Sequence, residues 1–316
     1  MAAVADSRLQ VDGRPGTQPR MTGRIGSSMI TPNNLSKARE LAARGALFVF
    51  NHSGGKDSQA MMLALLAVLP REQVVVLHAD LGEVEHLGTQ EHARTQAADA
   101  GVPFVVATAR KTFLGMVEGR FAKRPSVPSW PSAKHRQCTS DLKRGPIQRE
   151  VRRIAKERGI KLIVNCMGLR AQESPGRAKK PAWAVNKPLS KRGREAYDWL
   201  PIHGATTADV FATIKQAGQE PHWAYAAGNE RLSCVFCIMG SANDARVGAT
   251  ERPELFERYV AIEDKTGYTM HMSRKSLTEL TGMSVGDAYL AHANRGARRS
   301  LPVVQNDAPA KRGCSL

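Results

Sequence analysis

Acidic residues, aromatic residues and long apolar runs are scarce in this chain of 316 residues. Aromatic side chains make up 5% of it, and 29 acids face 46 lysines and arginines, which gives a formal net charge of +17. No run approaches the roughly 18 apolar residues that a membrane-spanning helix needs. Residues 1–24 lack the apolar segment of a secretory signal, so we expect neither a signal nor contact with a membrane. The hydrophobic content of 42% suits a packed globular core.

Cysteine is also rare, with five residues, which is an odd number. A chain of this length does not depend on disulfides for its stability, and an odd count does not suit a disulfide framework. We therefore expect free thiols and a reducing, cytoplasmic environment.

The positive charge is concentrated in residues 110–194. This stretch holds 23 lysines and arginines against five acids, so the rest of the chain has a net charge of −1. Such a surface attracts polyanions such as DNA, RNA or a highly charged nucleotide, and a solvated face that keeps the protein soluble is the alternative. The stretch has Trp130 and Trp183 but few other aromatic residues, which favours phosphate contact over base stacking.

Short apolar runs alternate with helical patterns along the first half of the chain. Thr31-Pro32 predicts the start of a helix that ends at Gly45. Buried strands are predicted at residues 47–50, 74–77, 104–107 and 162–164, and helices between them at 59–69, 90–100 and 147–158. This alternation predicts an α/β fold with a parallel sheet.

The strongest local signal is Ser53-Gly54-Gly55-Lys56-Asp57-Ser58, which lies between a predicted strand and a predicted helix. This context brings free backbone N–H groups and the positive end of a helix to one point, which is an anion-binding arrangement. The glycines let the backbone approach phosphate oxygens, Lys56 supplies a positive charge, and the serines supply hydroxyls. The spacing is not that of a Walker A loop, because the four residues between its glycines are absent.

This hexapeptide resembles the PP-loop of the ATP pyrophosphatases, which cleave ATP to AMP and pyrophosphate, usually to adenylate a substrate. Further stretches are similar to the phosphoadenosine phosphosulfate (PAPS) reductase branch of that superfamily and occur in its order: residues 78–85, 137–146, 168–174 and 199–210. The resemblance covers residues 45–270. It implies a PP-loop fold that binds ATP and Mg²⁺, with a smaller helical region that contains cysteines at its C-terminal side.

The loop of this chain is complete, whereas sulfonucleotide reductases generally have a degenerate loop because their nucleotide is already activated. The resemblance therefore favours the ATP-using relatives, which include the sulfur-insertion proteins of DNA phosphorothioation and tRNA thiolation. It implies that Lys56, Asp57 and Arg170 are catalytic and that a sulfur-donor protein is a further partner. The basic stretch at residues 110–194 suggests that a nucleic acid is the acceptor. The alternatives are a reductase of PAPS or adenosine phosphosulfate, and a non-catalytic nucleotide-binding protein.

The nucleotide site is expected to include residues that follow other strands of the sheet. Asp80 and Glu83 are candidates for holding Mg²⁺ or the nucleoside, and a strand-end cap is the alternative for Asp80. Arg170 could hold a phosphate or sulfonate through its guanidinium, and Glu173 could balance Arg170 or bind metal; a structural salt bridge is the alternative for this pair. The full set of predicted binding residues is Ser53, Gly54, Gly55, Lys56, Asp57, Ser58, Asp80, Glu83, Gly168, Arg170 and Glu173.

Cys234-Val235-Phe236-Cys237 is a C-x-x-C pair, a spacing that serves zinc, iron–sulfur clusters and redox chemistry. The resemblance places Cys138 and this pair where relatives hold a [4Fe–4S] cluster. Cys166 is the first candidate for the fourth ligand, with His135 and Cys314 as others, although a small buried core residue is the alternative for Cys166. Zinc and no metal are the alternatives for the group as a whole. Cys314 also suggests the catalytic cysteine of the reductases, and a free thiol is its alternative.

Composition and motifs divide the chain into four segments. Residues 1–30 are predicted to be a flexible basic arm, residues 31–232 the PP-loop nucleotide-binding domain, residues 233–300 the helical C-x-x-C region, and residues 301–316 a flexible tail. Residues 170–198 are basic and polar with three prolines, which predicts a long loop. Further helices are predicted at 207–218, 254–266 and 276–280.

Overall fold

The computed structural model describes residues 29–299. Nearly all of the predicted arm, the predicted tail and Cys314 lie outside the described residues. The chain folds around a six-stranded sheet with the order β3-β2-β1-β4-β6-β5, in which every neighbouring pair is parallel except β5 and β6. The strands are β1 (Leu47–Asn51), β2 (Val74–Asp80), β3 (Phe104–Thr108), β4 (Leu162–Met167), β5 (Trp183–Val185) and β6 (Glu195–Trp199). The predicted α/β fold with a mostly parallel sheet is confirmed.

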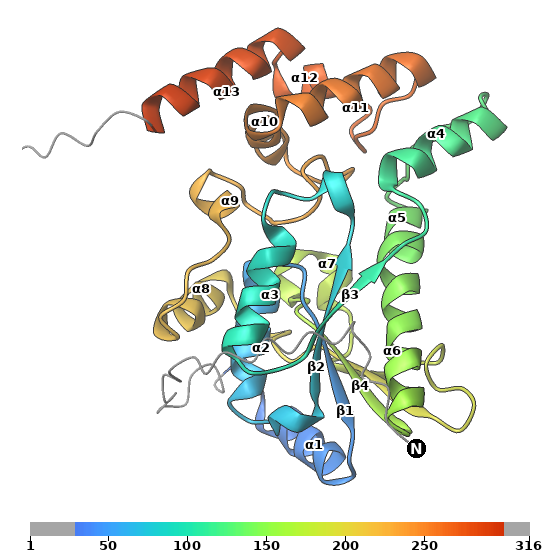
Figure 1. Cartoon of the computed structure of the whole chain (residues 1–316), viewed down its shortest axis with the longest axis vertical. Helices are drawn as coiled ribbons and strands as arrows, with labels where there is room; N and C mark the ends of the chain where they lie inside the picture. The colour runs from blue at the N-terminus through green and yellow to red at the C-terminus, as the bar shows by residue number, and fades with distance from the viewer. Residues whose placement is uncertain (1–28, 300–316) are drawn as a thin grey trace, which may run out of the picture.

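Four helices cover one face of the sheet: α1 (Pro32–Ala43), α2 (Lys56–Leu66), α3 (Thr89–Asp99) and α8 (Thr207–Gln216). Successive side chains of a strand point to opposite faces, so alternate residues reach these helices. Phe48 and Phe50 of β1 and Val74 and Val76 of β2 are buried here. With the apolar residues of the four helices they form the α2-side core (Figure 1).

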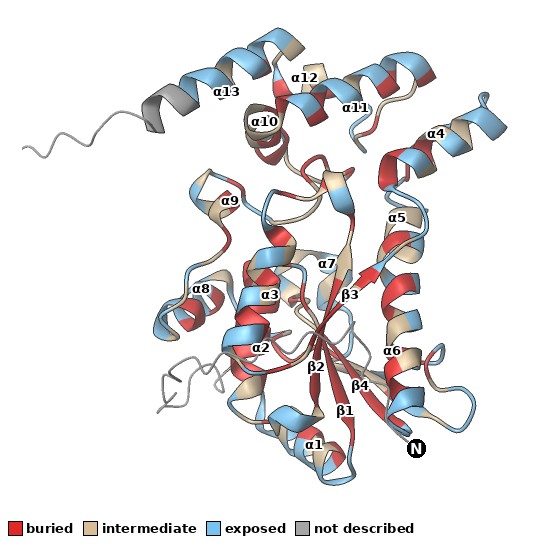
Figure 2. Ribbon diagram, in the orientation of Figure 1, coloured by how far each residue is buried: buried red, intermediate tan, exposed pale blue. Residues whose placement is uncertain are grey.

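The long helix α6 (Gly145–Glu157) covers the opposite face of the sheet. Leu47 and Val49 of β1 alternate with the residues named above and meet Ile147, Val151 and Ile154 of α6, which form the α6-side core. The central strands β1, β2 and β4 are therefore buried on both faces, as Figure 2 shows, which is the usual environment of a parallel sheet.

A third core lies beyond the carboxyl ends of the parallel strands (Figure 1). It is built by α4 (Phe113–Lys123), α10 (Ala242–Glu251), α11 (Pro253–Thr266), α12 (Leu277–Thr281) and α13 (Val285–Arg299). Trp130 is buried in it and donates its indole N–H to the carbonyl oxygen of Tyr268 at 2.8 Å. This helical core draws on residues 113–142 as well as on the C-terminal helices, so the two parts of the chain fold together.

Short elements join these parts. They are the single turns η2 (Arg71–Gln73), η3 (Gly82–Val84) and η5 (Ala171–Glu173), the short helices α5 (Gln137–Thr139), α7 (Pro175–Ala178) and α9 (Trp223–Ala226), and a π-helical turn η4 (Ser140–Arg144). None of the helices between residues 29 and 299 combines the length and apolar character that crossing a membrane requires.

The prediction of one long loop at residues 170–198 is wrong. This segment contains η5, α7, β5 and the start of β6, and β6 pairs with β4 in the parallel sheet. Trp183 of β5 stacks on Trp199 of β6 with ring centres 4.7 Å apart. β5 has only three residues and β6 contains Glu195 and Asp198, so neither gives a clear strand pattern in the sequence, and pairing with the sheet defines them.

Ile154 offers a test of how much α6 contributes to stability. Its side chain is 2% exposed, so the change Ile154→Ala should leave a cavity in the α6-side core. We expect a loss of about 2–4 kcal/mol in the free energy of unfolding, measured by urea denaturation. The change Arg152→Ala, at an exposed position of the same helix, should alter stability by about 0.5 kcal/mol or less. Equal effects of the two changes would contradict this packing.

Candidate functional site

Two of the predicted motifs meet where the order of the strands reverses. The chain leaves β1 toward α2 on one face and enters β4 from α6 on the other, and β1 and β4 are neighbours. In open α/β sheets, ligands bind in the crevice outside the carboxyl ends of the strands at such a point. Residues 53–58, which we call the phosphate loop, follow β1, and residues 168–173 follow β4.

The phosphate loop has a backbone shape that requires glycine. Gly54 has a φ of 75°, and a Cβ atom on it would lie 2.6 Å from Cγ2 of Thr89. The loop is closed by its own serines, because the Ser58 hydroxyl donates to the Gly55 carbonyl at 2.8 Å and accepts from the Ser53 N–H at 3.2 Å. Ser58 therefore shapes the loop from within.

Three backbone donors at the start of α2 are unpaired in the part of the chain that the structure describes. The N–H groups of Gly55, Asp57 and Ser58 have no hydrogen-bond partner among residues 29–299. They lie at the positive end of an 11-residue helix, where backbone donors favour an anion. These three groups are the candidate donors of the predicted anion site.

Lys56 is held by a buried charge network. The lysine is 4% exposed, and its Nζ lies 3.2 Å from Oδ2 of Asp57. Arg170, which is 3% exposed, donates from Nε to the other carboxylate oxygen of Asp57 at 2.6 Å. Two cations share one carboxylate, so this corner of the site keeps a net positive charge. The arrangement suits a multiply charged anion.

The guanidinium of Arg170 is engaged within the protein. Its remaining nitrogens donate to Oε1 of Gln172 at 2.9 Å, to Oγ1 of Thr207 at 3.2 Å and to the carbonyl of Ala205. In this arrangement Arg170 acts through Asp57, so we describe it as a positioning residue. Glu173 accepts from the backbone N–H of Arg170 and pairs with the side chain of Arg177.

Gly168 allows the loop after β4 to approach α2 closely. A Cβ atom on Gly168 would lie 2.8 Å from the carbonyl oxygen of Asp57 and 3.1 Å from the backbone nitrogen of Ser58. These distances are shorter than van der Waals contact, so a side chain here would push the first turn of α2 away. The contact explains the glycine, and it fixes Arg170 next to Asp57.

The two candidate carboxylates after β2 have different surroundings. Asp80, at the end of β2, accepts the Gly82 N–H at 2.7 Å with Oδ1 and remains at the carboxyl edge of the sheet. Glu83 pairs with Arg258 of α11. The structure therefore brings Asp80 to the edge where the phosphate loop lies and directs Glu83 toward the helical core.

Tyr225, which the sequence analysis did not identify, covers the phosphate loop. Its hydroxyl accepts the backbone N–H of Lys56 at 3.1 Å, and Nζ of Lys56 lies 5.2 Å from the centre of its ring. Burial raises the pKa of Tyr225 to about 12, so the hydroxyl is neutral. A Cβ atom on Gly55 would lie 3.3 Å from Cβ of Leu232, which shows how closely residues 225–232 pack on the loop.

Four histidines pack behind the loop, which nothing in their sequence spacing indicates. His92 and His222 have ring centres 5.4 Å apart, and His86 and His222 have ring centres 6.3 Å apart. His52 accepts the backbone N–H of Gly54 at 3.1 Å and so joins this cluster to the loop. Burial lowers the pKa of His52 to about 3 and those of His86 and His222 to about 4, so these rings are neutral at pH 7.

The predicted cysteines separate into two places. Cys138 and Cys234 both pack against the helical core, and Cys237 is close enough for its charge to act on Cys234. Burial raises the pKa of Cys234 to about 12, although Lys143 opposes the rise. Cys166 lies instead in β4 with its side chain in the α2-side core, where burial raises its pKa. The candidate role of Cys166 as the fourth ligand is therefore not supported, and it is a buried core residue.

The cysteines do not fit the expected metal centre. A [4Fe–4S] cluster needs four thiolate ligands. Among residues 29–299, no three His, Cys, Asp or Glu side chains converge on a point that could hold a metal ion. The same observation gives no support to zinc bound by three cysteines and one histidine, and His135 is exposed on the surface.

The chain matches the phosphoadenosine phosphosulfate reductase domain over residues 48–239, and it belongs to this family. An uncharacterised 37.8 kDa protein of Escherichia phage 186 is 34% identical over 149 residues, which cover 46% of this chain. The matched part spans 38% of the length of that phage protein. Membership of the family supports adenine-nucleotide binding as the general role of the site.

Two solved structures resemble the chain at low sequence identity. The PAPS reductase of Candida auris in a phosphate complex is 12% identical, with a TM-score of 0.40 over 65% of this chain and 96% of that chain. The FMN adenylyltransferase of Candida glabrata in complex with FAD and inorganic pyrophosphate is 14% identical, with a TM-score of 0.43 over 67% of this chain and 60% of that chain.

The contact of Gly168 with α2 can be tested by adding one methyl group. The change Gly168→Ala should displace the start of α2, lower stability by about 1–3 kcal/mol and weaken nucleotide binding by about tenfold or more, measured by calorimetry. The change Gly176→Ala, where a Cβ atom would meet nothing within 4 Å, should leave both quantities unchanged. Normal nucleotide binding by the Gly168 variant would show that the approach of the two loops is unimportant.

The histidine cluster predicts acid sensitivity. The pKa values of His52, His86 and His222 are lowered in the folded state, so the unfolded chain binds more protons between about pH 4 and 6.5. The contribution of these histidines to the free energy of unfolding should therefore be fully present above pH 6.5. It should fall as the pH decreases, by about 1.4 kcal/mol per pH unit for each imidazole.

Urea denaturation at pH 7.5 and at pH 5.5 measures this slope. The change His222→Gln should reduce the slope of the free energy of unfolding against pH by the contribution of one imidazole, because the variant lacks one of the rings that resist protonation. The change His135→Gln, at an exposed position, should leave the slope as it is. Equal stability of the wild-type protein at the two pH values would contradict the neutral, buried state of the cluster.

Proposed function

We propose that this chain binds Mg²⁺-ATP at the phosphate loop and cleaves it to AMP and pyrophosphate, transferring the adenylyl group to an acceptor. The observation that carries the proposal is the complete loop, with unpaired N–H groups at the start of α2 beside the buried Lys56. A protein that bound only an activated sulfonucleotide would have no pyrophosphate leaving group to hold. In the proposal, Lys56 and these donors bind that group.

The proposed reaction uses the loop to stabilise the leaving group. An acceptor oxygen attacks the α-phosphorus of ATP, and the bond to the bridging oxygen of the β-phosphate breaks, so pyrophosphate leaves with the electron pair. Negative charge grows on the pyrophosphate, where the backbone donors and Lys56 lower its energy. Fixed donors are effective here because they need no reorganisation during the step.

Asp57 and Arg170 serve this step by fixing Lys56. Lysine side chains are flexible, and a free Lys56 would lose conformational entropy each time it met a phosphate. Its contact with Asp57 sets its position in advance, and the bonds from Arg170 to Asp57, Gln172 and Thr207 fix Asp57 in turn. We therefore assign Lys56 a direct role and Asp57 and Arg170 positioning roles.

Asp80 is the residue that fits a magnesium ion brought by the nucleotide. Mg²⁺ is usually held by one or two carboxylates, with water and substrate phosphates as its other ligands. Asp80 uses one carboxylate oxygen on Gly82, and its other oxygen has no hydrogen-bond partner among the described residues. When bound, the ion would neutralise charge on the phosphates.

We further propose that adenylation prepares the acceptor for sulfur, as in the phosphorothioation-type branch that the motifs resemble. The adenylated oxygen becomes a good leaving group, and AMP departs when a sulfur nucleophile attacks the acceptor. The uncompensated positive charge in residues 110–194 supports a nucleic acid as acceptor, and a separate sulfur-donor protein would supply the sulfur. No step is assigned to an iron–sulfur cluster.

A sulfonucleotide reductase is the second candidate. The family to which the chain belongs carries the name of that activity, which favours it. The candidate catalytic cysteine for that chemistry is Cys314, which lies outside the described residues, whereas Cys138, Cys234 and Cys237 lie around the helical core. Under this alternative PAPS binds and is reduced, and ATP is not cleaved.

Replacing Lys56 tests the proposed site. The change Lys56→Ala should lower the formation of AMP and pyrophosphate from Mg²⁺-ATP by about 100-fold or more, because a charge on the leaving group is lost. The assay is run without oxygen to protect the thiols, with and without DNA or tRNA. The change Lys215→Ala, at an exposed position of α8, is the matched control and should leave the rate unchanged. An unaltered rate in the Lys56 variant would show that the site lies elsewhere.

A further inference from the structure

The basic stretch of the sequence divides between the two ends of the sheet. Residues 110–144 follow β3 and lie with α4 and α5 beyond the carboxyl ends of the strands (Figure 1). The helix α6 then crosses the whole sheet, so Lys156, Arg158 and Lys161 lie at the opposite end, where β4 begins. The N–H of Glu195 at the start of β6 donates to the carbonyl of Lys161 at 2.7 Å, which confirms that position. Residues 110–144 and the segment that follows β4, which includes Arg170, share the end of the molecule that carries the phosphate loop.

Positive charge at that end is not neutralised within the protein. Residues 110–144 contain nine lysines and arginines and two acids, Glu118 and Asp141. None of the nine forms an ion pair with a residue that the structure describes, and Glu118 is paired with Lys265 of α11. On α6, in contrast, Arg149 pairs with Glu150. The charge at the carboxyl end is therefore available to a partner.

The helix α4 presents part of this charge in a fixed direction. Phe113, Leu114 and Val117 are buried in the helical core and hold one side of the helix in place. Arg120 and Lys123 follow in the last turn of the helix and Arg124 is its C-cap residue; Lys123 and Arg124 are exposed and Arg120 is half-buried. The buried residues therefore fix the position of the helix that carries these cations.

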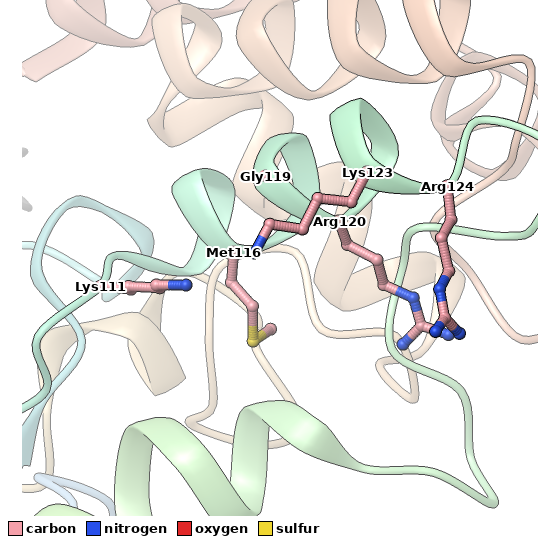
Figure 3. Close-up of a pocket in the computed structure, with 6 residues that line it drawn as sticks. All are labelled: Lys111, Met116, Gly119, Arg120, Lys123 and Arg124. Atoms are coloured by element: carbon pink, nitrogen blue, oxygen red, sulfur yellow. The ribbon is translucent and has the colours of Figure 1, made fainter.

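A hollow of about 350 Å³ lies beside α4 and these cations. It is lined by Lys111, Met116, Gly119, Arg120, Lys123 and Arg124. Figure 3 shows Met116 and Arg120 of α4 and Arg124, the residue after it, extending in the same direction, with Lys111 just before the helix begins. The hollow contains no acidic side chain, so an anionic group would meet positive charge on several sides.

We propose that this face of α4 is the docking surface for the backbone of double-stranded DNA, an inference that rests on the proposed function and names its acceptor. The α4 face is taken here as Lys111, Arg120, Lys123 and Arg124. Phosphates are contacted by lysine and arginine without regard to base sequence. The 11 residues of α4 span about 16 Å, close to half of the roughly 34 Å turn of a duplex.

The same surface is unsuited to single strands. Proteins that hold single-stranded nucleic acid or RNA loops stack the bases on exposed aromatic side chains. Among the described residues, the large exposed apolar side chains all lie outside residues 110–144, and Trp130 is buried in the helical core. A surface that offers cations but no stacking platform favours the backbone of a paired duplex.

The experiment measures DNA binding directly, without ATP, by fluorescence anisotropy of a labelled 20-base-pair duplex over a range of salt concentrations. The full-length variant Arg120→Gln, Lys123→Gln, Arg124→Gln removes three charges from the α4 face. The matched control Lys156→Gln, Arg158→Gln, Lys161→Gln removes three exposed charges from the opposite end. We expect the first variant to bind about tenfold or more weakly at 0.1 M salt. The slope of the logarithm of its binding constant against the logarithm of the salt concentration should be smaller by about 3, and the control should bind like wild type.

Several results would overturn the inference. These are no binding of the duplex by the wild-type protein, equal losses in the two triple variants, or tighter binding of single-stranded DNA or tRNA than of the duplex. The variant Arg120→Lys, Lys123→Arg, Arg124→Lys keeps the charges and should restore binding, which separates loss of charge from misfolding. Salt-dependent duplex binding without any cleavage of ATP would contradict the proposed function but support the docking surface.

Discussion

The carboxylate of Asp57 is the contact on which the rest of the site depends. It lies between two buried cations, with Lys56 on one oxygen and Arg170 on the other. Lys56 begins α2 and Arg170 follows β4, so this one group joins the two chain segments that meet where the strand order reverses. If this half-buried carboxylate had only one partner, the other buried cation would be uncompensated, which is costly. The three side chains therefore hold one another, and their surplus positive charge faces the unpaired backbone donors.

Close backbone packing protects this arrangement from three sides. Gly168 brings the loop after β4 against the first turn of α2, and Gly54 fits against Thr89 at the start of α3. Tyr225 closes the third side by accepting the Lys56 N–H. The site is thus assembled from segments that are more than 160 residues apart in the sequence, and the helical core holds the C-terminal segment over it.

The sequence predicted the sheet and the phosphate loop because both depend on local patterns. Apolar runs such as residues 47–50 and the glycine-rich turn at 53–58 are visible without knowledge of the fold. The strand β6 was missed because its residues are largely polar and only pairing with β4 makes it a strand. The histidine cluster and Tyr225 were missed for a related reason, since His52, His222 and Tyr225 become neighbours of the loop only through long-range packing. Cys166 is separated from the other cysteines because its side chain lies on the α2 side of β4, and the sequence pattern does not show which face it occupies. The proposed domain boundaries and the roles of the site residues stay predictions.

The central claim is that the charged corner around Asp57 holds the pyrophosphate part of ATP during cleavage between the α- and β-phosphates. The most direct measurement is ³¹P nuclear magnetic resonance of Mg²⁺-ATP incubated anaerobically with the wild-type protein and a DNA duplex. AMP and pyrophosphate should appear together in equal amounts, with no ADP. Intact ATP with or without DNA, or the appearance of ADP and phosphate, would contradict the account.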